Sequence, residues 1–217
     1  MATSAGANTN AEGLVINEIL ASNASQQLDT DFYNFSDWIE LYNGTNSPLD
    51  LNGYYLSDDV ANPTKWQFKG SVVIEAHDYL LVWADGEDTG LHTNFGLKHE
   101  GETLFLYDTE QNLVDALEFT EQVPDVSYGR ATDGAATYVY YSSPTPAQTN
   151  NNSLGLAAPI TAFEPQFSQN GGFYNGSQQI SLTLPPDTPA TIYYSLDGSI
   201  PDESAEIYSG PITVNQT

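Results

Sequence analysis

Short runs of alternating or apolar residues recur along this chain, and this pattern constrains the fold most strongly. The run LVINEIL spans residues 14–20 and DWIELYN spans residues 37–43. Similar runs follow at residues 54–58, 65–68, 102–108, 113–119, 126–130 and 137–141, and residues 70–85 form two runs around a turn at Ala76–Asp78. Helical periodicity is nearly absent. Runs spaced by roughly ten residues, with turn residues between them, are typical of an all-β sandwich or barrel.

The composition supports a packed β-protein. The chain has 217 residues, enough for one large or two small domains. Hydrophobic residues make up 40%, which is enough for a buried core. The 14 tyrosines, 9 phenylalanines and 3 tryptophans favour strands over helices.

The charge excludes several classes of function. A formal net charge of −25 repels phosphate backbones and anionic lipid surfaces, so we expect neither nucleic-acid binding nor membrane insertion. There are no cysteines, which rules out disulfides, thiol catalysis and cysteine-based zinc sites. Because residues 1–12 are small and polar, with no signal-peptide core, we expect either a cytosolic protein or a mature secreted segment.

The domain organisation is predicted from a change in composition. Residues 142–159 are rich in Pro, Ser and Asn and have no apolar period, which is typical of a linker. We therefore expect a flexible segment over 1–12, a first β-sandwich over 13–145, a linker over 146–159 and a second domain over 160–217. Strands are predicted in the second domain at residues 179–185, 190–197 and 210–216.

The first domain resembles the lamin tail domain, an immunoglobulin-like β-sandwich. The signals that carry the resemblance occur in order along residues 13–150: LVINEILASN, DWIELYN, PLDLNGYYLSDD, KWQF, YLLVWAD, NFGLKHEGETLFLYD, VD, SYGR, DG and SPTPAQTNN. The resemblance implies an immunoglobulin-like sandwich fold. It also implies a non-enzymatic module that accompanies a separate catalytic or anchoring part in large secreted bacterial proteins.

Residues 160–217 resemble the immunoglobulin-like domain at the C-terminus of chitobiase-type glycosidases. FEPQFSQNGGFYNGSQQISLTL and ATIYYSLDGSIPDESAEIYSGPITV carry this resemblance. That family continues with further strands, so this second, smaller sandwich is expected to be incomplete. Either a longer chain or strand addition by a partner would then supply the missing strands.

Two glutamates lie within predicted strands. Glu40 shares a strand face with Trp38 and Tyr42, and Glu18 is predicted in phase with Ile16 and Leu20. Paired carboxylates can serve acid–base catalysis, but semi-buried ones more often act as structural braces. Arg130 is the only arginine, and we expect it to form a structural ion pair with Glu18 or Glu40.

Metal binding is a weaker hypothesis. The loop ADGEDTG at residues 84–90 groups Asp85, Glu87 and Asp88 around a glycine, which makes a weak candidate for Ca²⁺. Its spacing differs from the EF-hand loop, and a plain acidic turn is the simpler interpretation. The three histidines, at positions 77, 92 and 99, lie in predicted loops and are expected to be exposed rather than zinc ligands.

Common motifs for nucleophilic serine, phosphate-binding and zinc-protease sites are missing, and no cofactor is predicted. We therefore expect a non-catalytic binding, spacing or anchoring module of a larger extracellular or cell-surface protein, with a protein or polysaccharide partner. One alternative is a carbohydrate-binding module that targets an attached enzyme, suggested by the tryptophans and paired tyrosines. A second is an assembly subunit that exchanges strands.

Overall fold

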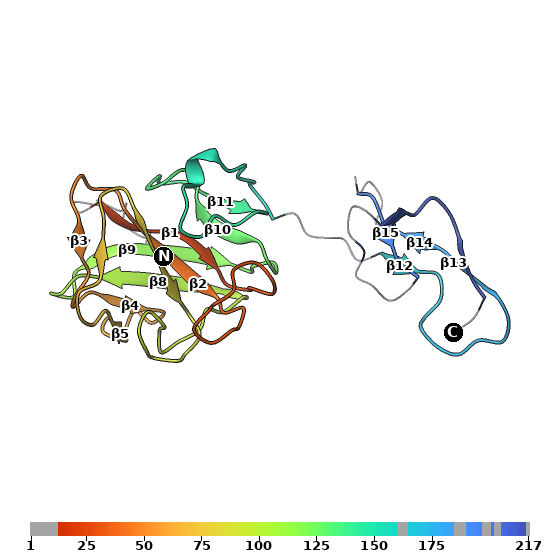
Figure 1. The fold of residues 1–217 in the computed structure, drawn as a ribbon, viewed down its shortest axis with the longest axis horizontal. Coiled ribbons are helices and arrows are strands. Elements are labelled where there is room, and N and C mark those ends of the chain that lie inside the picture. The colour runs from red at the N-terminus through yellow and green to blue at the C-terminus, as the bar shows by residue number, and fades with distance from the viewer. Residues whose placement is uncertain (1–12, 160–164, 185–189, 197–200, 202–204, 216–217) are drawn as a thin grey trace, which may run out of the picture. The chain divides into compact units, whose positions relative to one another are not determined.

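The chain folds into two units, and the regular elements of the described residues are β-strands apart from one short 3₁₀ helix (Figure 1). The computed structural model describes residues 13–159, 165–184, 190–196, 201 and 205–215. The division between the units falls between Ile160 and Thr161. The all-β fold predicted from the sequence is confirmed. The predicted N-terminal segment 1–12 lies outside the described residues.

The first unit contains a five-stranded antiparallel sheet in the order β11-β10-β1-β2-β7. Its strands are β1 (Leu14–Leu20), β2 (Trp38–Asn43), β7 (Tyr79–Trp83), β10 (Ser127–Arg130) and β11 (Tyr138–Tyr141). Each lies within or beside a run predicted from the alternating pattern. The sequence therefore located the strands of this sheet correctly.

A four-stranded antiparallel sheet forms the opposite layer, in the order β5-β4-β8-β9. Its strands are β4 (Tyr55–Ser57), β5 (Trp66–Gln67), β8 (Gly101–Tyr107) and β9 (Leu113–Thr120), and a separate short pair joins β3 (Leu49–Asp50) to β6 (Val73–Ile74). The strands β8 and β9, which match the runs predicted at residues 102–108 and 113–119, pair as an antiparallel hairpin.

The hydrophobic core lies between these two sheets. In Figure 1 the strands β8 and β9 cross β1 and β2, and side chains from all four join one buried cluster. On β2, Ile39 and Leu41 point into this cluster while Glu40 points away, as the alternation predicts. Leu117 and Phe119 enter the cluster from β9. Burial of each such side chain contributes about 1.5–3 kcal/mol.

A β-bulge interrupts β1 and changes the expected direction of Glu18. Ile16 lies opposite Leu41, but Glu18 lies opposite Glu40, so the register shifts at Asn17. Ile16 therefore points into the core, whereas Glu18 points to the other face of the sheet. The prediction that Glu18 is in phase with Ile16 was wrong, because an extra residue in a strand reverses the alternation.

Arg130 joins the two sheets through an ion pair with Asp115. Its Nη2 lies 2.7 Å from Oδ2 of Asp115 on β9, and both side chains are nearly fully buried. Arg130 Nε donates to the carbonyl of Ile16 at 2.9 Å, and Asp115 Oδ2 accepts the Ile16 amide at 2.8 Å. The predicted pairing of Arg130 with Glu18 or Glu40 was therefore wrong. β10 pairs with β1 at Glu18 and Ile19, and the ion pair hydrogen-bonds the Ile16 backbone beyond this ladder.

The segment predicted as a linker is largely part of the first unit. Residues 146–156 contain the 3₁₀ helix η1 (Asn150–Asn152), and Leu156 exchanges backbone hydrogen bonds with Tyr140 of β11. Asn150 is fully buried, and its Nδ2 donates to the carbonyl of Arg130 at 2.9 Å. Hydrogen bonds attach this segment to the sheet. Because they need no periodic apolar residues, the sequence pattern did not predict the attachment.

In the described residues of the second unit, six short strands form three antiparallel pairs: β12 with β14, β13 with β17, and β15 with β16. Their bounds are β12 (Gln166–Phe167), β13 (Gln178–Ile180), β14 (Leu182–Thr183), β15 (Tyr193–Tyr194), β16 (Glu206–Ile207) and β17 (Ile212–Val214). The predicted strands at 179–185, 190–197 and 210–216 overlap four of them, although residues 185, 197 and 216 lie outside the described residues. Within the described part of the chain, no helix has the length and apolar character required to cross a membrane.

We predict that Arg130→Met strongly destabilises the first unit. It would leave the Asp115 carboxylate buried without its guanidinium partner, at a cost of about 3–5 kcal/mol. Lys98→Met is the matched control, because the Lys98 side chain is 60% exposed in its 2.6 Å ion pair with Glu102, so its loss should cost less than the loss of the buried Arg130. Urea unfolding followed by tryptophan fluorescence measures the difference, since all three tryptophans lie in the first unit. Equal losses in the two variants would contradict the bracing role.

Candidate functional site

Two glutamates face each other on neighbouring strands of the five-stranded sheet. Glu18 of β1 lies opposite Glu40 of β2, and both are fully buried. Removing two carboxylates from water is costly unless hydrogen-bond donors replace the water. The partners of these two side chains therefore decide whether the pair is reactive or structural.

Glu18 accepts hydrogen bonds from two residues. Ser127 on β10 donates its hydroxyl to Oε1 at 2.5 Å. Thr145 donates its backbone amide to the same oxygen at 3.0 Å, and its hydroxyl donates to Oε2. Both carboxylate oxygens of Glu18 are thus occupied, and one partner comes from the segment that follows β11.

Glu40 is held in the same manner. Asn17, the residue at the bulge, donates Nδ2 to Oε1 at 2.9 Å. The backbone amide of Ala147 donates to Oε2 at 2.7 Å. Ala147 has a positive φ of 55°, so the chain takes an unusual backbone conformation at this contact.

Asp133 extends the network toward the surface. The Nδ2 atom of Asn17 also donates to Asp133 Oδ1, at 3.1 Å. The hydroxyls of Tyr79 and Thr149 donate to Asp133 Oδ2 at 2.7 and 2.5 Å, and the Asn150 amide donates to Oδ1 at 3.0 Å. The three acids, Glu18, Glu40 and Asp133, therefore form one hydrogen-bonded cluster, which we call the carboxylate cluster.

Burial changes the protonation of the carboxylate cluster. It raises the pKa of Glu18, against the opposing effect of hydrogen bonds from Ser127 and Thr145. Burial and then repulsion by Glu18 raise the pKa of Glu40 to about 9, although hydrogen bonds from Asn17 and Ala147 oppose the shift. Glu40 therefore keeps its proton at neutral pH, which reduces the repulsion between the facing side chains.

The arrangement leaves no route for chemistry at these two glutamates. A general acid or base must come within hydrogen-bond distance of its substrate. Glu18 and Glu40 have no exposed surface, and the bonds from Thr145 and Ala147 hold the segment after β11 against them. A substrate would have to displace this segment to reach either carboxylate.

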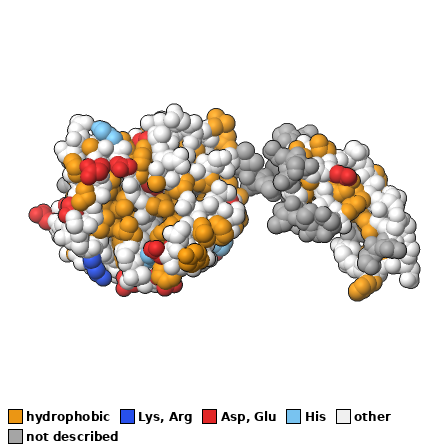
Figure 2. Space-filling model, in the orientation of Figure 1, with side chains coloured by type: hydrophobic (Ala, Val, Ile, Leu, Met, Phe, Trp, Pro, Cys, Tyr) orange, Lys and Arg blue, Asp and Glu red, His pale blue; other side chains and the backbone are white. Residues whose placement is uncertain are grey.

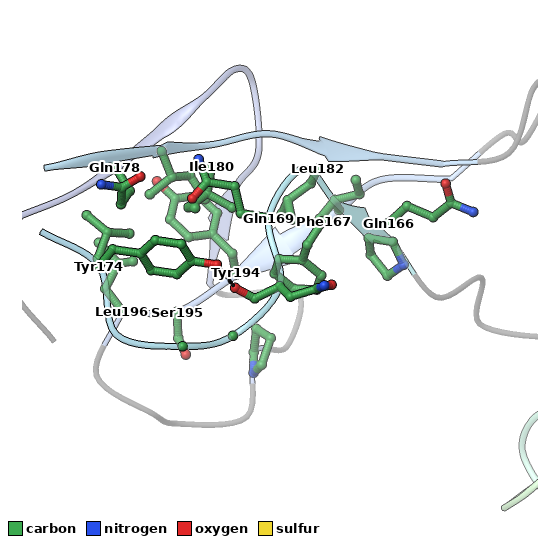
Figure 3. Close-up of a pocket in the computed structure, with 18 of the residues that line it drawn as sticks. Gln166, Phe167, Gln169, Tyr174, Gln178, Ile180, Leu182, Tyr194, Ser195 and Leu196 are labelled. Atoms are coloured by element: carbon green, nitrogen blue, oxygen red, sulfur yellow. Dashed lines mark hydrogen bonds between the residues drawn. The ribbon is translucent and has the colours of Figure 1, made fainter.

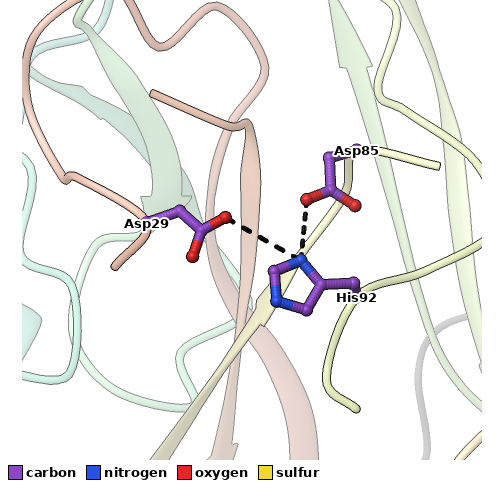
Figure 4. Close-up of side chains that lie close together, drawn as sticks. All are labelled: Asp29, Asp85 and His92. Carbon is purple, nitrogen blue, oxygen red and sulfur yellow. Dashed lines mark hydrogen bonds and ion pairs between the residues drawn. The ribbon is translucent and has the colours of Figure 1, made fainter. Parts of the chain in front are cut away.

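The loop after β7 does not group the three acids predicted as weak Ca²⁺ candidates. Asp85 lies beside His92, with 2.7 Å between Asp85 Oδ2 and His92 Nδ1. Glu87 and Asp88 are exposed, and among the described residues neither joins Asp85 in a potential metal-binding group. The group that does form contains Asp29, Asp85 and His92 (Figure 4).

His92 differs from the prediction that all three histidines are exposed. It is only 2% exposed, packs edge-on against Phe32 with the ring centroids 4.9 Å apart, and stacks on Trp83. His77 and His99 are exposed as expected. The two rings come from elsewhere in the sequence, so loop position alone could not reveal the burial of His92.

The second unit contains an open groove of about 1170 Å³ (Figure 3). Its lining combines the aromatic rings of Tyr174 and Tyr194 with the side-chain amides of Gln166, Gln169 and Gln178. The Tyr174 hydroxyl donates to the carbonyl of Asn170 at 2.6 Å, which helps to fix that side chain at the groove. Figure 2 shows hydrophobic side chains reaching the visible surface of this unit.

Asp133 and the Asn17 donor of the carboxylate cluster were not predicted from the sequence. Asn17 contributes because of the bulge, and Asp133 is placed by a turn between β10 and β11. The weak signal was the stretch SPTPAQTNN, whose hydroxyl, amide and backbone donors directly follow a strand. Such donors, next to acids within strands, indicate hydrogen-bonded packing more than a linker.

The two antiparallel sheets that enclose one core define a β-sandwich module, consistent with an immunoglobulin-like fold. The chain belongs to the lamin tail domain family, because the Lamin Tail Domain model matches residues 7–121, just over half of its length. Residues 169–217 match the model of the chitobiase/beta-hexosaminidase C-terminal domain. The two resemblances found in the sequence are thereby confirmed, in the predicted order. Both matching families consist of non-catalytic domains. A search of curated proteins found no match.

We predict that the carboxylate cluster makes the first unit less stable as the pH rises. A pKa raised from 4.5 to about 9 means that the folded state of Glu40 binds its proton more tightly than the unfolded state. This contribution is complete below pH ~4.5 and is lost as the pH rises toward 9. The melting temperature of the wild type should therefore fall between pH 6 and pH 9.

Glu40→Gln should reduce this slope, because the amide of the substituted side chain does not titrate in this range. The difference between the two slopes isolates Glu40 from other groups that titrate between the same pH values. Glu118→Gln is the control, since Glu118 is exposed on β9 and its substitution should leave the slope unchanged. Equal slopes in the wild type and Glu40→Gln would show that Glu40 is ionised in the folded protein.

Proposed function

We propose that this chain is a non-catalytic binding, spacing or anchoring module of a larger secreted or cell-surface bacterial protein. The observation that carries the proposal is the complete burial of Glu18 and Glu40, the two acids that could otherwise serve as a catalytic pair. Glu18 and Glu40 have no exposed surface, and every carboxylate oxygen of the pair accepts a hydrogen bond. Such acids stiffen a scaffold that presents loops and sheet edges to a partner.

Two further observations support this proposal. Both matching families are non-catalytic domains, and the chitobiase-type C-terminal domain typically occurs in extracellular proteins. The net charge of −25 keeps a secreted module soluble and disfavours adsorption to nucleic acids. On this proposal, the catalytic or anchoring activity resides in other domains of the same protein.

The proposal predicts that the purified chain turns over no substrate. A panel of polysaccharides, chromogenic glycosides and phosphoesters should give rates equal to buffer, as measured by reducing-sugar and phosphate release. Glu18→Gln and Glu40→Gln serve as probes, with folding checked by circular dichroism. Turnover that disappears in either folded variant would assign a catalytic role to the glutamates and would overturn the proposal.

Carbohydrate binding is the second candidate, and the groove of the second unit favours it. Sugars stack on aromatic rings while amides and hydroxyls hydrogen-bond their hydroxyl groups. The groove offers both, in Tyr174, Tyr194 and the glutamine side chains around them (Figure 3). Tyr174 keeps 44% of its surface exposed, so its ring is available for stacking.

We predict for this candidate that the chain is retained on insoluble chitin or cellulose and that Tyr174→Ala weakens retention about tenfold, a loss of ~1.4 kcal/mol. Tyr33→Ala is the control, because Tyr33 is 82% exposed but lies in the first unit. Affinity gel electrophoresis and depletion assays measure the two variants. Equal retention of the variants, or no retention of the wild type, would remove this candidate.

A further inference from the structure

One buried carboxylate oxygen in the first unit has no hydrogen-bond partner. Asp29 is fully buried, and its Oδ1 accepts the backbone amide of Asp31 at 2.8 Å. Its Oδ2 has no hydrogen-bond partner among the described residues. A buried, unsatisfied carboxylate oxygen is costly and requires an explanation.

This oxygen points at two other potential ligands. Asp29 Oδ2 lies 4.0 Å from His92 Nδ1, and the same nitrogen lies 2.7 Å from Asp85 Oδ2. All three donor atoms lie within 4.8 Å of one another. Figure 4 shows the two carboxylates converging on the same edge of the imidazole ring from different segments of the chain.

The spacing of these atoms is close to that of a metal site. Ligands at ~2.0–2.2 Å from a tetrahedral Zn²⁺ ion are about 3.3 Å apart. The 2.7 Å separation would have to widen and the 4.0 Å separation would have to narrow, each by less than about 1 Å. Since all three donor atoms lie within 4.8 Å of one another, side-chain rotations that bring them to about 3.3 Å apart would convert the group into three ligands.

The donor set selects the kind of ion. Ca²⁺ and Mg²⁺ prefer oxygen ligands alone, whereas imidazole together with carboxylates suits Zn²⁺ and its first-row neighbours. Three protein ligands leave one position open for water or for a side chain of a partner. In the number and type of its ligands, the group is closer to a zinc site with one open position than to a calcium or magnesium site made of oxygen atoms alone.

A third acid lies on the opposite side of the imidazole ring. Asp31 Oδ2 lies 3.4 Å from His92 Nε2, and its side chain is 74% exposed. A metal-bound histidine usually donates its other ring N–H to a carboxylate, which fixes the ring orientation and strengthens the metal–nitrogen bond. Asp31 is placed to accept that hydrogen bond while Nδ1 binds the ion.

We propose that Asp29, Asp85 and His92 form a binding site for Zn²⁺ or a similar divalent transition-metal ion. The ion joins the loop between β1 and β2 to the loop after β7, because Asp29 lies in the first loop and the other ligands lie in the second. Phe32 and Trp83 pack against His92 and limit the access of water. This proposal does not depend on the proposed function.

A titration of the full chain, without a histidine tag, tests the proposal. Isothermal calorimetry should show one Zn²⁺ ion bound per chain after treatment with a chelator. A hundredfold excess over the dissociation constant should raise the melting temperature of the first unit by about 5 °C. Ca²⁺ and Mg²⁺ should produce no such shift. A shift with Ca²⁺ and none with Zn²⁺ would overturn the choice of ion.

Variants separate this site from weak binding by surface acids. Asp85→Asn and His92→Gln should weaken Zn²⁺ binding at least tenfold. The double variant of Glu87→Gln and Asp88→Asn is the matched control, because these exposed acids lie on the same loop and bind no metal in this proposal. If the control loses as much affinity as Asp85→Asn, binding belongs to the acidic loop in general, and the proposed site is wrong.

Co²⁺ supplies a local signal that does not depend on stability. It substitutes for Zn²⁺, and bound beside His92 it should quench the fluorescence of Trp83, whose ring centroid lies 6.4 Å from that of His92. Trp83→Phe should abolish this part of the quenching and retain metal binding in calorimetry. Because Trp38 lies opposite Trp83 on β2, some quenching will remain; an undiminished extent of quenching in Trp83→Phe would place the ion elsewhere.

Discussion

The main constraint on the first unit is that its buried acids must be stabilised with very few basic side chains. The chain has 29 acidic residues and only 4 lysines and arginines, so most acids that enter the sandwich must be stabilised without a cation. The single arginine is used where the two sheets meet, against Asp115. Glu18 and Glu40 are stabilised by neutral donors instead, which come from Asn17, Ser127, Thr145 and Ala147. This requirement explains why a polar segment follows β11 and packs on the sheet.

The sequence predicted the strands well because burial between two sheets imposes a period of two. Ile39 and Leu41 face the core and Glu40 faces away, as that period requires. The prediction failed at Glu18, where the bulge at Asn17 inserts a residue that no periodicity reveals. The prediction of a linker at residues 146–156 was wrong for a related reason. Hydrogen bonds attach that segment to the sheet, and they require no periodic pattern of apolar residues.

Candidate site residues were harder to predict because they depend on contacts between distant segments. Arg130 and Asp115 are close in sequence but belong to opposite sheets, and both hydrogen-bond the backbone of Ile16 on β1. The burial of His92 depends on Phe32, which lies on a loop much earlier in the chain. Composition identified Asp85 as a possible ligand, but only the fold brings Asp29 to it.

Buried acids in this sandwich therefore fall into two kinds, and the number of donors distinguishes them. Glu18 and Glu40 have a donor on every oxygen, so a bound ion or substrate would have to displace hydrogen bonds that stabilise the sheet. Asp29 is equally buried but leaves one oxygen without a donor, beside an imidazole nitrogen. A cation at that oxygen would replace no existing hydrogen bond of Asp29 and would remove the cost of its desolvation. In this acidic sandwich, the carboxylates whose oxygens all accept hydrogen bonds stabilise the fold. Asp29 Oδ2, which has no donor among the described residues, is the oxygen at which binding of a cation would be most favourable.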